Sequence, residues 1–414
     1  MTGAAGSAGN NSPVASYLGA TGLSLLGNAL ISVILPWIVL QRHGAPAAAL
    51  VAAATGLPTA AGALLGGRLV DCWGRRRVST GADLLSGSSV ATMAFIDVTT
   101  GLTPTWFIVL AAAGAVLDIP GACAREAQIS EVASASGTGV ERLAGLRGSL
   151  FGAAFLIGPL VAGLLLGRTP DALLLMGVAA LSVGAGWIGT RIPDATASTV
   201  AQAGQARWAA WKTIAQDGAL RRLLLVAVAT ALVSRPLVTL LLPAHFQAVD
   251  SPARLGLTLA AYAGGTTVGS ALFARYGHLS RPSWWTGANI ASATCLAIAA
   301  FLPATAWLVA SMAALGAAGA PVQSLTTVLL AEHTPIRRRG GVFTIFASAG
   351  LLAAPLALAV AALILRYANP AQLMASTCTA WALICLGSIA MAPTFAVPPR
   401  AGSPGVDQDS REYG

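Results

Sequence analysis

The sequence predicts an all-α membrane protein in which twelve transmembrane helices form two six-helix bundles. Of its 414 residues, 56% are hydrophobic and only 9% are charged, and the mean hydropathy is +0.73. Soluble domains carry about 25% charged residues, so this chain has too few polar side chains to cover a core in water. The hydrophobic residues also fall into runs of roughly 20 residues, the length that crosses a bilayer as a helix.

Twelve apolar windows can be placed along the chain, separated by short polar segments. None of the windows contains more than a few charged residues, which favours helices that span lipid over helices packed in a soluble core. The expected spans are 16–40, 47–70, 79–98, 105–124, 148–167, 171–190, 222–244, 254–275, 284–303, 305–330, 341–366 and 372–393.

The basic residues predict the orientation of these spans. With the N-terminus placed inside, 19 of the 24 Lys and Arg residues fall in inside loops and the C-terminal tail. Only Arg42, Arg168, Arg254 and Arg366 fall outside, and Arg235 lies within a span. Because positive residues are retained on the cytoplasmic side, we expect a multi-pass protein of the inner or plasma membrane with both termini in the cytoplasm.

A long polar stretch divides the spans into two sets of six. Within it, ARWAAWKTIAQDGALRR places Trp208, Trp211, Ile214 and Ala215 on one helix face, which predicts an interfacial amphipathic helix. The expected organisation is a cytoplasmic tail at 1–15, a bundle at 16–190, a cytoplasmic linker at 191–221, a second bundle at 222–393 and a tail at 394–414.

Two short matches suggest that the two bundles are parallel repeats. Pro120 precedes Glu131 by eleven residues, and Pro321 precedes Glu332 by eleven. Further on, RGSLF at 147–151 matches RGGVF at 339–343. Both matches lie late in the fourth span or at the start of the fifth span of each set, as internal repeats of a transporter would require.

Several classes of function find no support in the sequence. There is no GxxxxGK[ST] loop for a nucleotide, no cysteine or histidine spacing that holds a metal, and no catalytic constellation, so we expect neither an enzyme nor a cofactor. The net charge of +9 lies in short loops, a pattern of membrane orientation and not of nucleic-acid binding. The N-terminus lacks the basic residues of a cleaved signal peptide, so the first apolar run is expected to be retained.

One charged loop carries a family resemblance. The stretch GGRLVDCWGRRRV at 66–78, between the second and third spans, resembles the loop motif G-x-L-x-D-R-x-G-R-R of the major facilitator superfamily, with Cys72 where the family has Arg. The resemblance implies two bundles that rock about a central site, with this loop helping to hold the cytoplasmic side shut. The gating residues it implies, with Arg125 from LDIPGACAREAQISEV added, are Gly67, Asp71, Gly74, Arg75, Arg76 and Arg125.

The fifth span carries a second resemblance. GLRGSLFGAAFLIGPLVAG resembles the antiporter motif G-x8-G-x3-G-P-x2-G-G of the same superfamily, which marks exporters that exchange substrate for protons. Gly145, Gly158, Pro159 and Gly163 match, whereas Ala154 and Ala162 replace glycines. Gly158, Pro159 and Gly163 are added to the predicted gating residues. General packing of small residues in a glycine-rich chain is the alternative explanation. The segments at 117–132 and after the tenth span are similar to the macrolide and siderophore exporters of the superfamily.

Ionisable residues within spans are costly and therefore mark candidate functional positions. Arg235 lies about twelve residues into span seven, near the bilayer middle, and Pro236 should loosen the helix there. Asp118 lies in span four, and Asp83 lies near the inner end of span three. Asp118 and Asp83 are candidates for proton coupling, although Asp118 and Arg235 could instead form a structural pair and Asp83 could brace the loop.

Polar and aromatic residues supply further candidates for binding a small-molecule substrate. Trp37 can stack on a ligand or lie at the membrane interface. The predicted substrate-binding residues are Asn28, Trp37, Arg235, Tyr262 and Gln323.

Without a nucleotide site, transport must draw on an ion or substrate gradient. The sequence therefore predicts a monomeric, proton-coupled exporter of a small amphipathic compound such as an antibiotic, drug or secondary metabolite. The alternatives are siderophore export, solute import, or a membrane sensor, although a sensor would need a soluble output domain and no stretch is long enough for one.

Overall fold

The computed structural model describes residues 12–192, 203–277, 280–301, 304–335, 338–365, 367 and 369–395. Every regular element within these ranges is helical, as predicted. The first six spans correspond to α1 (Ser12–Trp73), α2 (Arg75–Thr99), α3 (Pro104–Ala115), α4 (Asp118–Ser136), α5 (Val140–Leu165) and α6 (Asp171–Gly189).

The element α1 contains the first two spans, which meet at Gly44. This glycine has φ 78° and ψ 174°, a conformation that side chains with a Cβ rarely adopt, and it reverses the chain between the two spans. Gly74, with φ 82°, is the one-residue link between α1 and α2. The turn predicted between spans two and three is therefore shorter than expected, because both helices extend to its edge.

The second set of spans follows the linker helix α7 (Ala203–Gln216). Pro236 ends the first helix of this set, and a π-helical turn follows it. The predicted loosening of the helix at this proline is therefore present. The elements are α8 (Gly218–Pro236), η1 (Leu237–Leu241), α9 (Leu242–Ala248), α10 (Pro252–Tyr276), α11 (Arg281–Phe301), α12 (Thr305–Glu332), α13 (Arg339–Ile364), α14 (Pro370–Ser388) and the 3₁₀ segment η3 (Ile389–Phe395).

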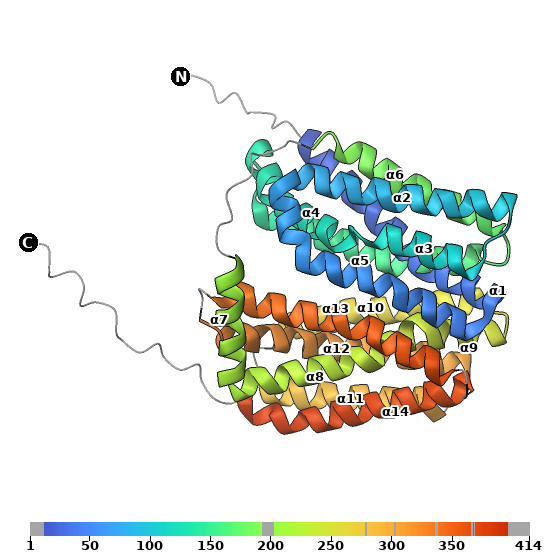
Figure 1. Cartoon of the computed structure of the whole chain (residues 1–414). Helices are drawn as coiled ribbons and strands as arrows, with labels where there is room; N and C mark the ends of the chain where they lie inside the picture. Colours follow the sequence, from blue (N-terminus) through green and yellow to red (C-terminus); the bar gives the residue numbers. More distant parts are fainter. Residues whose placement is uncertain are drawn as a thin grey trace, which may run out of the picture.

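The helices pack into two groups that lie side by side (Figure 1). Helix α1 packs on α3, α4, α5 and α6, whereas α12 packs on α10 and α11, and α14 packs on α11 and α8. The groups meet through α5 against α10 and α1 against α13. We call α1–α6 the first bundle and α8–α14 the second bundle; the residue bounds expected for the bundles, linker and tails stay predictions.

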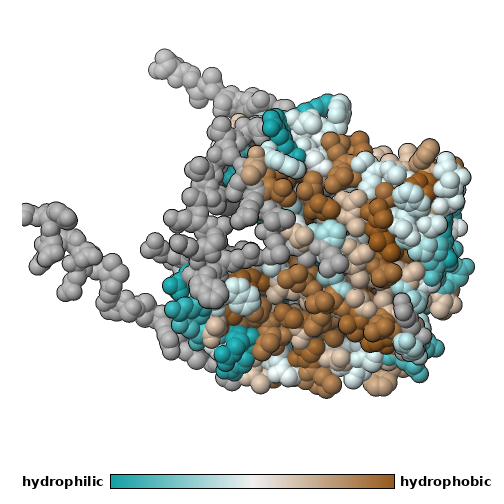
Figure 2. Space-filling view, viewed as in Figure 1, coloured by the Kyte–Doolittle hydropathy of each residue, from teal (hydrophilic) through white to brown (hydrophobic). Residues whose placement is uncertain are grey.

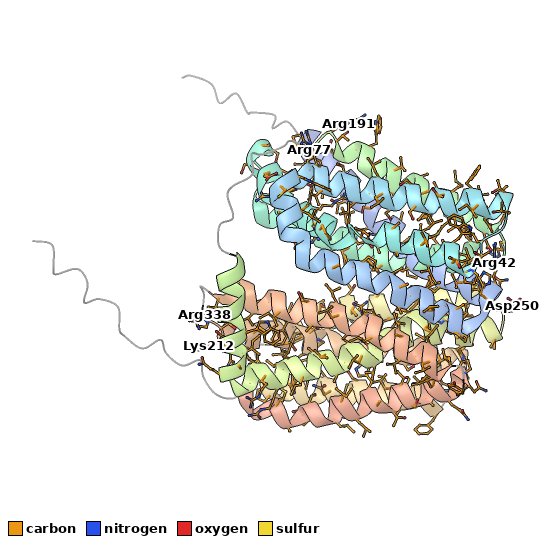
Figure 3. All side chains as sticks on the ribbon, in the orientation of Figure 1. Arg42, Arg77, Arg191, Lys212, Asp250 and Arg338 are labelled. Atoms are coloured by element: carbon orange, nitrogen blue, oxygen red, sulfur yellow. The ribbon has the colours of Figure 1, made fainter. Side chains whose placement is uncertain are left out.

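The outer surface is suited to lipid. Figure 2 shows apolar side chains over the flank of the molecule and hydrophilic ones towards its ends. The labelled charged residues also lie at the two ends, with Arg77, Arg191, Lys212 and Arg338 at the end that carries α7 and Arg42 at the opposite end (Figure 3). Within the described ranges, nine helical segments are long and apolar enough to cross a membrane. The protein is therefore a multi-pass membrane protein.

Buried apolar clusters show that the bundles are joined at one end only. The largest cluster combines Val39 of the first bundle with Leu241, Phe246 and Leu365 of the second, at the end away from α7. Near α7 each bundle has clusters of its own, such as the one around Tyr17 in the first bundle and those around Ile214 and Trp285 in the second. The structure is thus closed at the end away from α7 and separated at the α7 end.

Helix α7 packs on α13 and α8 of the second bundle. Its buried side chains are Ala210, Thr213 and Ile214, whereas Trp211 and Ala215 are exposed, so the buried face is turned from the one expected from the sequence. The side chain of Trp208 lies outside the described residues.

Asp217 joins this helix to the second bundle. Its carboxylate accepts hydrogen bonds from the backbone amides of Ala219 and Leu220, at 2.7 and 3.3 Å, and lies 2.9 Å from Nδ1 of His333. Partial burial opposes ionisation of Asp217, but the hydrogen bonds from His333 and the two amides outweigh it and lower the pKa of the carboxyl.

Candidate functional site

Asp118 lies at a break in the fourth span. Helix α3 ends at Ala115 and α4 begins at Asp118, because Pro120 lacks the amide that would continue the helix through this point. The carboxylate is thereby placed in the first turn of α4, beside the break in the span. Discontinuous helices that carry a charged group in mid-membrane are a feature of ion and substrate sites in transporters.

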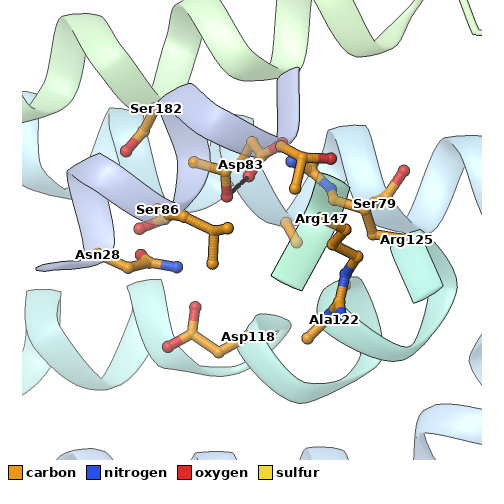
Figure 4. Close-up of a pocket in the computed structure, with 14 residues that line it drawn as sticks. Asn28, Ser79, Asp83, Ser86, Asp118, Ala122, Arg125, Arg147 and Ser182 are labelled. Carbon is orange, nitrogen blue, oxygen red and sulfur yellow. Dashed lines mark hydrogen bonds and ion pairs between the residues drawn. The ribbon is translucent and has the colours of Figure 1, made fainter. Parts of the chain in front are cut away.

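Asp118 borders a polar cavity of about 70 Å³ inside the first bundle. The residue is exposed and faces this space. Figure 4 shows Asp118 and Asn28 on opposite sides of the cavity, with Asp83 and Arg125 beyond them. The volume holds a few water molecules but is far below the 300–1,000 Å³ of sites for drug-sized ligands. The cavity therefore suits a proton and water, not a bulky substrate.

A buried ion pair forms the wall of the cavity. The Arg125 guanidinium of α4 donates to the Asp83 carboxylate of α2, and both residues are only 7% exposed. Ser24 Oγ donates to the same carboxylate at 2.8 Å, and Arg125 also donates to the Ala20 carbonyl oxygen at 2.9 Å. The pair ties α2 and α4 to α1. No described residue forms a hydrogen bond or ion pair with Asp118, so the two carboxylates differ in their partners.

Arg125 is therefore not a loop residue. The apolar pattern predicts that span four ends at residue 124 and that Arg125 belongs to an inside loop, but α4 continues to Ser136. Arg147, also counted there, lies on α5 and lines the cavity, and it is 3.4 Å from Glu126. The apolar windows ended too early because charged residues that are paired inside a bundle look like the edge of a span.

The charged loop is described in part. Arg75 donates to the Glu131 carboxylate of α4, and Arg76 donates to the Ile192 carbonyl oxygen at 3.3 Å. These contacts tie the start of α2 to the ends of α4 and α6. The side chain of Asp71 and the surroundings of Gly67 lie outside the described residues, so their gating roles stay predictions.

The predicted antiporter glycines lie at close contacts between helices. A Cβ atom on Gly158 would lie 2.5 Å from the Ala29 Cβ of α1, inside the first bundle. A Cβ on Gly163 would lie 2.5 Å from the Pro252 carbonyl oxygen, and one on Gly256 would lie 2.2 Å from that of Pro159. Gly163 and Gly256 thus form the crossing of α5 and α10, which belongs to both bundles.

Small residues also explain GGTTVG at 264–269, which lies inside α10. Cβ atoms on Gly265 and Gly269 would lie 2.0 and 2.1 Å from backbone oxygens of Ala313 and Ala317 in α12. The small residues of this segment therefore serve the close packing of α10 on α12.

The candidates in and near the second bundle are not brought to the cavity. Arg235 is exposed on α8, close enough to Tyr262 of α10 for electrostatic interaction, and no described residue forms an ion pair with it. Gln323 is exposed on α12. Trp37 of α1 is 2% exposed in the core shared by the bundles. Asp118 and Arg235 do not form the structural pair that was one alternative.

The sequence repeat has a structural counterpart. Glu131, at the end of the fourth span, pairs with Arg75 at the start of α2, and Glu332 pairs with Arg281 at the start of α11, at 2.7 Å. The equal spacing of proline and glutamate in the two halves therefore reflects the same helix-to-helix contact in each bundle.

Comparisons with known proteins agree with this architecture. The sequence model of the major facilitator superfamily matches residues 17–354. The chain belongs to the major facilitator superfamily. It is 30% identical to the "Multidrug efflux pump Tap" of Mycobacterium tuberculosis H37Rv over 370 residues, which cover 85% of this chain and 87% of that protein. It is 28% identical to the pump of the same name from Mycolicibacterium fortuitum, over 81% of this chain and 85% of that one.

Solved structures of this superfamily share the fold. A D-xylose-proton symporter superposes with a TM-score of 0.74 at 15% identity, over 94% of this chain and 99% of that one. A peptide transporter superposes with a TM-score of 0.72 at 12% identity, over 92% and 94%. The family match establishes that the protein is a secondary transporter and not an enzyme. The solved structures confirm the fold class that the sequence predicts. Such transporters bind small molecules, often with coupling to protons.

Proposed function

We propose that this protein exports small amphipathic compounds in exchange for protons. The observation that carries the proton coupling is the position of Asp118, an acidic side chain without a cationic partner among the described residues, at a helix break and facing an enclosed polar cavity. A charge held inside a membrane protein without a partner is costly, so uptake of a proton relieves that cost.

Two further observations support export. The relatives of similar length are named as multidrug efflux pumps. In addition, the glycines of the predicted antiporter motif lie at close helix contacts, of which Gly163 against Gly256 is at the junction of the bundles. This junction suits a rocking movement because backbones in contact can roll without displacing long side chains.

The mechanism that we infer is alternating access. In the present conformation the bundles are joined away from α7 and separated near α7. With both termini in the cytoplasm, as the basic residues at the α7 end favour, this conformation is open to the cytoplasm. A proton released from Asp118 here would leave a carboxylate, and substrate would bind between the bundles, where Arg235, Tyr262 and Gln323 are the candidate contacts.

The gating contacts would stabilise one of the two conformations. Arg75 and Arg76 anchor the loop at Gly74 to the ends of α4 and α6. Arg125 keeps α4 in place beside Asp83. We propose that Gly67 and Asp71 complete this set when the α7 end closes.

Transport by everted membrane vesicles tests the proposal, with ethidium as the amphipathic probe. An imposed gradient, acidic inside, should drive ethidium uptake by the natural protein, and Asp118→Asn should abolish that uptake because the amide cannot carry a proton. Counterflow of ethidium without a pH gradient should survive in the variant. Proton-driven uptake that is unchanged in Asp118→Asn would remove Asp118 as the coupling site.

A control separates coupling from general damage. Thr326 of α12 donates to the Val322 carbonyl oxygen of its own helix, at 2.8 Å. Thr326→Ala should therefore transport at the rate of the natural protein. Equal losses in both variants would mean that the effect of Asp118→Asn is structural.

A further inference from the structure

A second cavity, of about 580 Å³, lies in the second bundle between α11 and α12. Its volume falls within the range of sites that hold drug-sized or lipid-sized ligands. The walls are made by small residues and one aromatic ring. The lining residues that the argument uses are Ser280, Ser283, Trp284, Ala291, Ala314 and Ala317.

The cavity opens on the outside of the bundle. Helix α11 packs on α12, α14 and η3, all from the same bundle, so its remaining face is turned away from the first bundle. Ala291 and Ala314 are exposed in the cavity. In a membrane protein this open side faces acyl chains, because lipid is the solvent of the outer helix faces.

Polar and cationic groups gather at one end of the cavity. Ser280 and Ser283 line it there, and Arg281 follows at the start of α11. The Trp284 Nε1 donates to the Tyr276 carbonyl oxygen at 3.1 Å, which holds the end of α10 and its exposed Arg275 beside the same opening. Arg281 also pairs with Glu332 but remains 42% exposed. Two serine hydroxyls therefore line this end of the cavity, and the paired Arg281 and the exposed Arg275 lie on the helix ends next to it.

The first bundle carries larger side chains at two of the matching positions. Ten residues after Arg281 is Ala291, whereas ten after Arg75 is Leu85. Four residues before Pro321 is Ala317, whereas four before Pro120 is Val116. Other matching positions are small in both bundles, so these two alanines distinguish the second bundle.

We propose that this groove, which we name the α11–α12 groove, binds an anionic phospholipid. One acyl chain lies along the small residues, and the headgroup phosphate lies against Arg275, Arg281 and the two serine hydroxyls. Charge complementarity selects this occupant: an apolar slot with a cationic, hydroxyl-bearing mouth matches a negatively charged headgroup on a hydrocarbon chain. The inference does not depend on the transported substrate.

Quenching of Trp284 by brominated lipids tests the proposal. The full chain is reconstituted in phosphatidylcholine vesicles that contain either brominated phosphatidylglycerol or the same fraction of brominated phosphatidylcholine beside unbrominated phosphatidylglycerol. The Trp284 signal is the fluorescence that Trp284→Phe removes. Brominated phosphatidylglycerol should quench this signal at a lower fraction than brominated phosphatidylcholine. Equal quenching by the two lipids would overturn the proposal.

Variants of the mouth test the headgroup. Each arginine replaced by glutamine should reduce the preference for phosphatidylglycerol by about fivefold, which corresponds to about 1 kcal/mol for a basic residue near a membrane surface. Glu332→Gln removes the ion pair but keeps the positive charge of Arg281. The preference for phosphatidylglycerol should therefore remain in this variant. An unchanged preference in Arg275→Gln with Arg281→Gln would contradict the proposed headgroup contacts.

Variants of the small residues in the α11–α12 groove test the contacts with the acyl chain. Ala291→Leu with Ala314→Leu should fill the groove and remove Trp284 quenching by both lipids. Ala310→Leu, an exposed alanine of α12 outside the groove, is the matched control and should leave quenching unchanged. The proposal is contradicted if Trp284 is still quenched in the filled variant. It is also contradicted if ethidium relieves the quenching of the natural protein and added phosphatidylglycerol does not.

Discussion

The α2–α4 region of the first bundle and the α11–α12 region of the second are the same scaffold with different chemistry. Both are tied by an Arg–Glu bridge at the α7 end, Arg75–Glu131 and Arg281–Glu332. Eight residues after the arginine stands Asp83 in one bundle and Asn289 in the other. Asp83 pairs with Arg125, whereas Asn289 donates to the Trp285 carbonyl oxygen at 2.9 Å and accepts from Ser388 Oγ at 2.8 Å.

The difference continues around the two prolines. Five residues after Pro120 is Arg125, and five after Pro321 is Thr326; two before Pro120 is Asp118, and two before Pro321 is Gly319. These three charged positions of the first bundle are therefore neutral in the second, whereas Arg147, which also lines the polar cavity, matches Arg339. The repeat supplies a common architecture, and Asp83, Asp118 and Arg125 belong to one bundle alone.

Breaking the buried interactions of each region should have unequal effects. Arg125→Gln leaves Asp83 buried without its cation and should lower the free energy of unfolding by about 3–5 kcal/mol. Asn289→Ala removes the hydrogen bonds to Trp285 and Ser388, but the Ser388 hydroxyl keeps the Cys385 carbonyl oxygen at 2.7 Å, so the change should cost only about 0.5–1.5 kcal/mol. Thermal unfolding in detergent measures both. The double variant Asp83→Asn with Arg125→Gln, which removes both charges, should recover part of the loss; equal losses in both bundles would break the comparison.

The rate of transport should depend on the close contact at the junction of the bundles. Gly163→Val places side-chain atoms against the Pro252 carbonyl oxygen and should slow transport severalfold while destabilising the fold by about 1–3 kcal/mol. Gly152 lies on the same helix, and a Cβ there meets no atom within 4 Å. Gly152→Val should therefore retain transport in the vesicle assay. Similar rates in both variants would show that the crossing does not govern the movement.

Asp217 tests a charged contact that belongs to the second bundle. Asp217→Ala removes both the cap of α8 and the pair with His333 and should cost about 1 kcal/mol, whereas Asp217→Asn keeps a capping oxygen and should cost less. Because the folded pKa of Asp217 is lowered, its carboxylate stabilises the protein above the unfolded pKa. The difference between the natural protein and Asp217→Asn should shrink as the pH falls below about 4. A difference that grows on acidification would contradict this assignment.

The two Arg–Glu bridges should show the smallest effects. Both are partly open to solvent, and such pairs contribute about 0–1 kcal/mol. The Glu131 side chain is 11% exposed and that of Glu332 is 29% exposed. Glu131→Gln should therefore lower the thermal midpoint more than Glu332→Gln does. The reverse order would show that the second bundle depends more on its bridge.

The sequence predicts the helices well because hydrophobic length is a local property. The structure has a helix at each of the twelve expected spans. The sequence also indicates Asp118, Asp83 and Asn28 as separate candidates. It did not show that they meet, since the meeting depends on how α1, α2 and α4 pack. Arg125 was misplaced for the same reason: a charge that is neutralised by a residue 42 positions away looks exposed in a local window.

The apolar cluster that joins the bundles away from α7 has an electrical consequence. A secondary transporter is useful only if the driving ions do not pass on their own. Val39, Leu241, Phe246 and Leu365 place hydrocarbon from both bundles in one continuous layer, and hydrocarbon offers water and protons no hydrogen-bonded route. The layer therefore separates the polar cavity from the end of the molecule away from α7. The proposed proton coupling requires such a barrier, because protons that leaked through would cross without moving substrate.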